Sequence, residues 1–198
     1  KKILLFLFLL VFGVRVVNAQ TTVFSDNFEG TTSGLPSTAG SPATFTTGSS
    51  PSMTYTVASN GTNPTVSVTT VTSKVLTINN GATTPVKSAN WVTGPLSSFS
   101  APFNTTLSSN PGLVTWSFNV SANNNSTGAF GSGGFYAPAV VLAASSATLL
   151  TAGNGYAVVS TTSSRYDLVR YTSGLSGTVT TIITGTAGSG NSTFRSIR

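Results

Sequence analysis

Apolar and polar residues alternate with a period of two in several short stretches of the chain. The clearest is VTWSFNV at residues 114–120, where Val, Trp, Phe and Val alternate with Thr, Ser and Asn. Successive side chains of a strand point to opposite faces, so the pattern predicts a strand with one buried and one solvated face. The same pattern predicts further strands at residues 53–57, 65–69, 74–79, 139–143, 155–160, 166–172 and 179–184.

These short, β-branched stretches predict an all-β fold. After residue 20 no stretch combines helix-forming residues with a period of 3.6. Roughly ten strands at this spacing fit an antiparallel two-sheet sandwich such as a jelly roll. We expect one β-sandwich domain over residues 20–198. Three segments rich in Gly, Pro, Ser or Asn are expected to lie outside strands, at residues 30–52, 102–111 and 123–134.

The N-terminus has the composition of an export signal, residues 1–19. Two lysines precede an apolar run, residues 3–14, and Val-Asn-Ala at 17–19 offers a cleavage position between Ala19 and Gln20. The alternative, a membrane anchor, needs about 20 apolar residues to span a bilayer as a helix, and this run is shorter. We therefore expect a secreted or cell-surface protein that does not span the membrane once the signal is removed.

The composition indicates how such a domain is stabilised and kept soluble. The chain contains no cysteine, so its fold depends on a hydrophobic core rather than on disulfides. Ser and Thr account for 64 residues, whereas charged residues make up only 6%. We expect hydroxyl groups to cover the solvated faces of the sheets.

The charge gives little reason to expect a nucleic acid partner. Three of the nine basic residues lie in the predicted signal, so residues 20–198 carry six basic and three acidic groups, a net charge of +3. The six basic residues are scattered along the chain, whereas binding to a phosphate backbone needs many simultaneous contacts.

Side chains with catalytic chemistry are scarce. The only carboxylates are Asp26, Glu29 and Asp167, and there is no histidine. General acid–base, nucleophilic and metal-assisted mechanisms recruit such groups in clusters. We therefore expect a protein that is not an enzyme.

Two parts of the chain resemble a known family. VFSDNFE at residues 23–29 resembles the opening strand of secreted concanavalin A-like (laminin-G-like) jelly rolls. GYAVV at 155–159 and YDLVRYTSGL at 166–175 resemble paired strands of the N-terminal module of large Bacteroidetes surface proteins. The resemblance implies a jelly roll followed by further domains and a type IX sorting signal. Because residues 192–198 end in a strand-like stretch, it also implies that the domain is truncated at its C-terminal end.

This family includes both lectins and glycosidases. Its laminarinase-like members carry Glu-x-Asp-x-x-Glu on one strand, because a retaining mechanism needs two carboxyl groups about 5 Å apart. The present chain has a single Glu and lacks that motif. A jelly-roll glycosidase is therefore the least favoured interpretation.

A small acidic cluster near the N-terminus suggests one metal site. Asp26, Asn27 and Glu29 bring together the oxygen ligands that Ca²⁺ prefers. The favoured interpretation is that Asp26 and Glu29 cap or solvate the edge of the first strand, with calcium binding as the alternative. Apart from this calcium, no cofactor is predicted.

Four residues are candidates for binding a ligand. Trp91 and Phe130 offer flat rings for the C–H faces of sugars, because no clean alternation surrounds Trp91 and Phe130 lies in a Gly-rich loop. Arg165 and Asp167 fall on one face of a predicted strand. They form either an ion pair or a polar rim for sugar hydroxyls.

Together these features predict a non-catalytic, secreted binding or adhesion module for a glycan or another cell-surface polymer. The alternative from a different class is a structural spacer that orders a larger surface protein and binds no ligand. Either would be joined to further domains of the same polypeptide.

Overall fold

A computed structural model of the protein describes residues 21–30, 43–59, 65–70, 74–79, 90–101, 103–104, 113–121, 138–161, 165–186 and 194–198. Within these ranges the regular structure consists of antiparallel strands and one short 3-10 turn, η1 (Leu96–Ser98). The predicted all-β class is therefore confirmed for this part of the chain. The predicted signal, its cleavage position at Ala19 and Gln20, Phe130 and the predicted loop at 123–134 lie outside the described residues.

The first sheet is built from three strands and is accompanied by a hairpin. β1 (Ala43–Thr46), β2 (Thr54–Ser59) and β5 (Asn90–Thr93) pair in the order β1-β2-β5. β3 (Thr65–Thr70) and β4 (Lys74–Asn79) form the hairpin. The two share one hydrophobic core, whose buried members are Phe45, Met53, Tyr55, Val57 and Val66.

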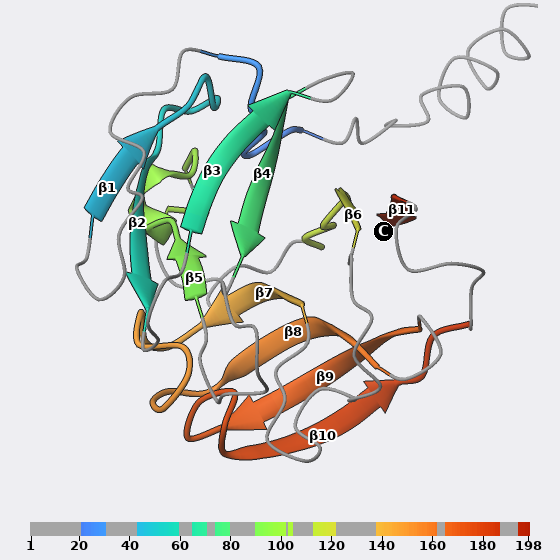
Figure 1. Cartoon of the computed structure of the whole chain (residues 1–198). Helices are drawn as coiled ribbons and strands as arrows, with labels where there is room; N and C mark the ends of the chain where they lie inside the picture. Colours follow the sequence, from blue (N-terminus) through green and yellow to red (C-terminus); the bar gives the residue numbers. More distant parts are fainter. Residues whose placement is uncertain are drawn as a thin grey trace, which may run out of the picture.

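The second sheet is a four-stranded meander. β7 (Ala139–Ala144), β8 (Gly155–Ser160), β9 (Tyr166–Thr172) and β10 (Thr178–Ile183) pair in the order β10-β9-β8-β7. Its inner face buries Ala157, Val159, Val169 and Tyr171. In Figure 1 this sheet lies below the β1–β5 strands, an arrangement of layers consistent with a β-sandwich.

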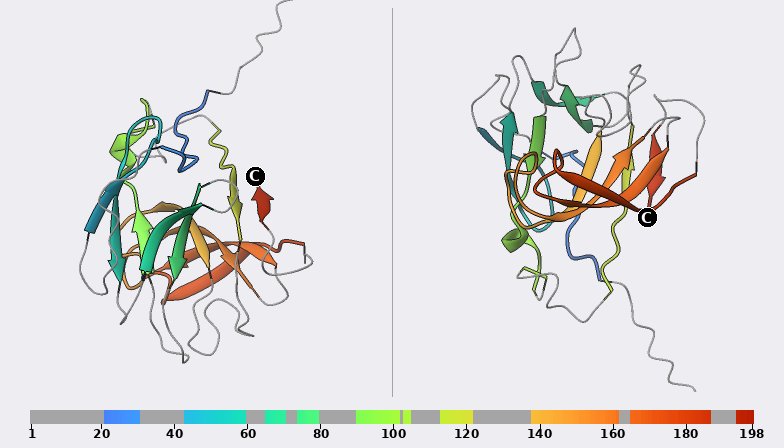
Figure 2. Two further views of the ribbon diagram at one scale, coloured as in Figure 1. Left: turned by 45° about the horizontal axis from the view of Figure 1, so that its top comes forward. Right: turned by 90° about the horizontal axis from the view of Figure 1, so that it is seen from below.

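A pair of short strands joins distant parts of the sequence. β6 (Phe118–Val120) and β11 (Arg195–Ile197) run antiparallel, with Ser196 opposite Asn119. The Ser196 hydroxyl donates a 2.6 Å hydrogen bond to Oδ1 of Asn119. Figure 2 shows the two strands next to each other at one side of the second sheet.

The prediction that residues 30–52 lie outside strands is wrong, because they contain β1. Phe45 is 2% exposed, and its ring stacks on Tyr55 with centroids 5.1 Å apart. The next positions on the same face are Thr47 and Ser49, which are also buried. Because β1 has only four residues and the buried positions that follow it are polar, the sequence shows too few apolar positions to identify the strand.

The predicted opening strand at residues 23–29 is also wrong in extent. This segment contains a single bridge, between Ser25 and Ser50. The chain then turns, since Oδ1 of Asp26 accepts a hydrogen bond of 2.8 Å from the backbone N–H of Phe28, and Phe28 has a φ of 60°. Side-chain bonding to a nearby backbone N–H competes with regular strand pairing.

Candidate functional site

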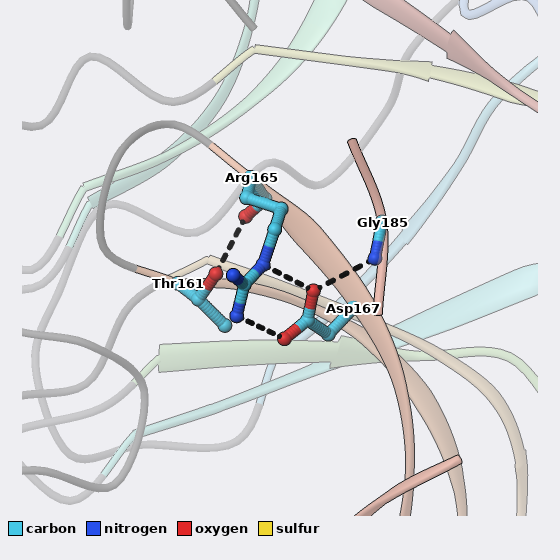
Figure 3. A network of polar contacts seen from close by, with 4 residues as sticks. All are labelled: Thr161, Arg165, Asp167 and Gly185. Carbon is cyan, nitrogen blue, oxygen red and sulfur yellow. Dashed lines mark hydrogen bonds and ion pairs between the residues drawn. The ribbon is translucent and has the colours of Figure 1, made fainter. Parts of the chain in front are cut away.

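Arg165 and Asp167 form an ion pair at the start of β9 (Figure 3). Nε of Arg165 donates to Oδ1 of Asp167 at 2.7 Å, and its Nη2 donates to Oδ2 at 2.8 Å. The backbone N–H of Gly185 also donates to Oδ1, at 3.0 Å. The predicted ion pair is confirmed, but the acid is buried, with 2% of Asp167 exposed.

The surroundings of Asp167 keep its carboxylate ionised. Burial raises the pKa of this group, but the hydrogen bonds from Arg165 and from the Gly185 N–H lower it, and the net pKa lies below the ordinary value. A general acid at neutral pH needs the opposite shift. Because both oxygens are occupied, a sugar hydroxyl would meet Arg165, whose side chain is 33% exposed, rather than Asp167.

The second acidic residue, Asp26, anchors the N-terminal segment to the first sheet. Its Oδ2 accepts hydrogen bonds from the Tyr55 hydroxyl at 2.7 Å and from the Thr47 hydroxyl. Burial and then the bonded, negatively charged Asp26 raise the pKa of Tyr55, so that its hydroxyl stays protonated. Both oxygens of Asp26 therefore accept from donors of the protein itself.

The neighbouring candidates for calcium are bonded in a similar way. Oδ1 of Asn27 accepts from the N–H of Glu29 at 3.1 Å. Oε1 of Glu29 accepts from the N–H of Lys74, the first residue of β4, at 2.7 Å. Among the residues the structure describes, no group of three His, Cys, Asp or Glu side chains comes together to hold a metal. The contacts fit the favoured interpretation, in which these residues secure the edge of the fold.

Trp91 lies on the outward face of the first sheet. Its neighbour Val92 packs against the core, opposite Val57. Because successive side chains of a strand alternate between faces, Trp91 points the other way, and the small Ala58 lies opposite it. Trp91 is partly exposed.

A further group of solvent-facing side chains, which the sequence patterns do not predict, lies on the second sheet. Tyr156 on β8 is directly opposite Arg170 on β9, and Arg170 is directly opposite Thr180 on β10. All three are exposed. Both Tyr156 and Arg170 fall within correctly predicted strands, but the sequence does not reveal the register that places them side by side.

No protein-family model matches this chain, and no curated protein or solved structure is significantly similar to it. Within the described ranges, no helix is long and apolar enough to cross a membrane.

Proposed function

We propose that this chain is a non-catalytic, secreted or cell-surface binding module with a jelly-roll fold, whose ligand is a glycan or a similar surface polymer. The observation that carries the proposal is the outward placement of Trp91 on β5, an outer strand of its sheet. If Trp91 were a core residue, its ring would lie on the same face of β5 as Val92.

The chemistry of an indole fits a sugar ligand. The flat ring offers a large apolar surface to the C–H face of a sugar, and its N–H supplies one hydrogen-bond donor. Thr93 is two residues from Trp91 on β5, so its hydroxyl group lies on the same face of the strand. Such groups exchange hydrogen bonds with sugar hydroxyls without a charge.

The state of the acidic residues favours binding over hydrolysis. Asp26 and Asp167 each accept bonds at both carboxylate oxygens, and Glu29 is bonded to the backbone of β4. A retaining or inverting glycosidase needs two carboxyl groups facing one bond of the substrate. These three acids are committed to separate structural contacts.

The test is binding of the purified protein to soluble polysaccharides in affinity electrophoresis, using xylan, glucomannan and polygalacturonate. We expect retardation by at least one polymer, weakened about tenfold in Trp91→Ala through loss of ring stacking. Phe194→Ala is the matched control, since Phe194 is 54% exposed but lies beside β11. Retardation that Trp91→Ala leaves unchanged would remove Trp91 from the site. No retardation by any polymer would instead favour the spacer.

A further inference from the structure

The row Tyr156–Arg170–Thr180 crosses three neighbouring strands on the outward face of the second sheet. β8, β9 and β10 lie side by side in Figure 1, and the three residues are partners in the two ladders that join them. Adjacent strands are about 4.8 Å apart, so the row is about 10 Å long. It brings an aromatic ring, a guanidinium and a hydroxyl into one line.

We propose that this row is a second binding surface, and that its ligand is an acidic polysaccharide carrying carboxylate or sulfate groups. The inference rests on the proposed function, because it assumes that the protein binds polymers. It adds a separate site, on the other sheet from Trp91, and names the chemical class of the ligand.

The exposure of the Tyr156 side chain supports a binding surface here. Tyr156 is 47% exposed, although its neighbours along β8, Gly155 and Ala157, are on the buried face of the same strand. The phenol ring therefore stands on the solvent side of the sheet. Its ring face can stack on a sugar while its hydroxyl remains hydrated.

The charge of Arg170 favours an acidic ligand. Asp26, Glu29 and Asp167, the only acids of the sequence, make their bonds elsewhere. Arg170 thus has no acidic partner among them. A guanidinium binds carboxylate and sulfate groups through two parallel N–H donors, so a charged polymer complements this position.

The hydroxyl-bearing surface beside Arg170 favours a polysaccharide ligand. Thr172 on β9 is opposite Thr178 on β10, and both are exposed on the same face as Arg170 and Thr180. β-branched residues hold their hydroxyls in few rotamers. The surface therefore presents ordered hydrogen-bond partners to the hydroxyls of a polysaccharide.

The experiment compares polymers that differ only in charge. Polygalacturonate is paired with its fully methyl-esterified form, and dextran sulfate is paired with dextran, so that the two arms distinguish a carboxylate ligand from a sulfate ligand. Affinities are measured by isothermal titration calorimetry at two salt concentrations. We expect the wild type to bind a charged polymer at least tenfold more tightly than its neutral counterpart.

Variants then assign the binding to the row. Tyr156→Ala and Arg170→Gln should each lower the affinity for the charged polymer about tenfold, the loss typical of one stacked ring or one charge-assisted bond. Arg170→Lys should recover only part of the affinity lost in Arg170→Gln, because a lysine lacks the two parallel N–H donors of a guanidinium. Phe194→Ala should bind like the wild type. Unchanged thermal midpoints of all variants establish that they remain folded.

The outcomes separate this inference from the proposed function. If the wild type binds polymers but Tyr156→Ala and Arg170→Gln leave the affinity for both charged polymers unchanged, the second surface is wrong and the proposed function stands. Single-stranded DNA bound as tightly as the acidic polysaccharides would also overturn it, since general polyanion attraction would then suffice. If the wild type binds no polymer at all, both proposals are wrong.

Discussion

Gly155 and Tyr171 are direct partners across the β8–β9 ladder, and the phenol of Tyr171 occupies the space that a side chain at position 155 would need. A Cβ atom added to Gly155 would lie 2.5 Å from the Tyr171 hydroxyl oxygen and would also meet the carbonyl oxygen of Ala143. Tyr171 is 1% exposed and belongs to the buried cluster of the second sheet. An aromatic ring that covers a glycine in the next strand compensates for the missing side chain.

We therefore expect Gly155→Ala to destabilise the fold by about 1–3 kcal/mol, the cost of overpacking a tight core site. Urea unfolding followed by tryptophan fluorescence measures the change. Combining Gly155→Ala with Tyr171→Phe should recover part of the loss, because the hydroxyl is the nearest ring substituent to the new methyl group. A fully tolerated Gly155→Ala would mean that this contact is looser than described.

The hydroxyl groups of Tyr171 and Tyr55 are expected to contribute differently to stability. The Tyr171 hydroxyl is buried and has no hydrogen-bond partner in the described part of the protein, whereas the Tyr55 hydroxyl donates to the carboxylate of Asp26. Removing an unsatisfied buried hydroxyl is neutral or stabilising, but removing a charge-assisted bond costs about 1.5–3 kcal/mol. Tyr171→Phe should therefore unfold at the same or higher urea concentration than the wild type, and Tyr55→Phe at a lower one.

The two phenylalanine variants control for each other, because each deletes one buried hydroxyl from a core tyrosine. A double-mutant cycle that combines Tyr55→Phe with Asp26→Ala isolates the interaction energy between Tyr55 and Asp26. A cycle that combines Tyr171→Phe with Asp26→Ala should give no interaction energy. Equal effects of Tyr55→Phe and Tyr171→Phe would contradict the assignment of the bond to Tyr55 alone.

The ion pair between Arg165 and Asp167 predicts how stability changes with pH. The pKa of Asp167 is lower in the folded protein than its ordinary value, so the folded state favours the ionised form. This contribution is fully present above the ordinary pKa of about 4 and is lost as the pH falls through the folded pKa. Thermal midpoints should be constant near neutral pH and fall below about pH 4.

Asp167→Asn should lower the midpoint at pH 7 and flatten the acidic part of this profile. Arg165→Ala alone should be more harmful than Arg165→Ala combined with Asp167→Asn, because the single variant leaves a buried carboxylate without its cation. Glu29→Gln serves as the comparison at an exposed acid. A profile that Asp167→Asn does not alter would show that another group causes the acid sensitivity.

The sequence predicted several strands well where buried positions are apolar, but the most regular pattern, at residues 114–120, is a strand only over Phe118–Val120. β8 and β9 have the bounds expected from alternation, and Asp167, Val169 and Tyr171 share the buried face. β1 was missed because it has only four residues, and the buried positions that follow Phe45 on the same face, Thr47 and Ser49, are polar. β5 was missed because Asn90–Thr93 is too short to show a period.

The site was predictable only in part, for physical reasons. Alternation placed Arg165 and Asp167 together, since their separation of two residues is a local property of one strand. The hydrogen bond from the Gly185 N–H to Asp167 joins residues 18 positions apart, on either side of β10, and therefore forms only on folding. The row through Tyr156 and Arg170 depends on the register of two strands, and register is fixed by packing and turns rather than by either strand alone.

The free edge of β10 gives the last prediction. Among the described strands β10 pairs only with β9, and no charged residue lies between Arg170 and Arg195. Ile182 and Ile183 are 50% and 58% exposed at a bulge in this strand. Edge strands that lack charge or proline pair readily with other chains.

We expect sedimentation velocity to detect reversible self-association that increases with protein concentration. Ile182→Lys should abolish it without lowering the thermal midpoint, because a lysine on an exposed edge opposes pairing at little cost to the fold. Ile78→Lys, at a residue 45% exposed on β4, should leave the association intact; a wild type that stays monomeric at high concentration would contradict the prediction.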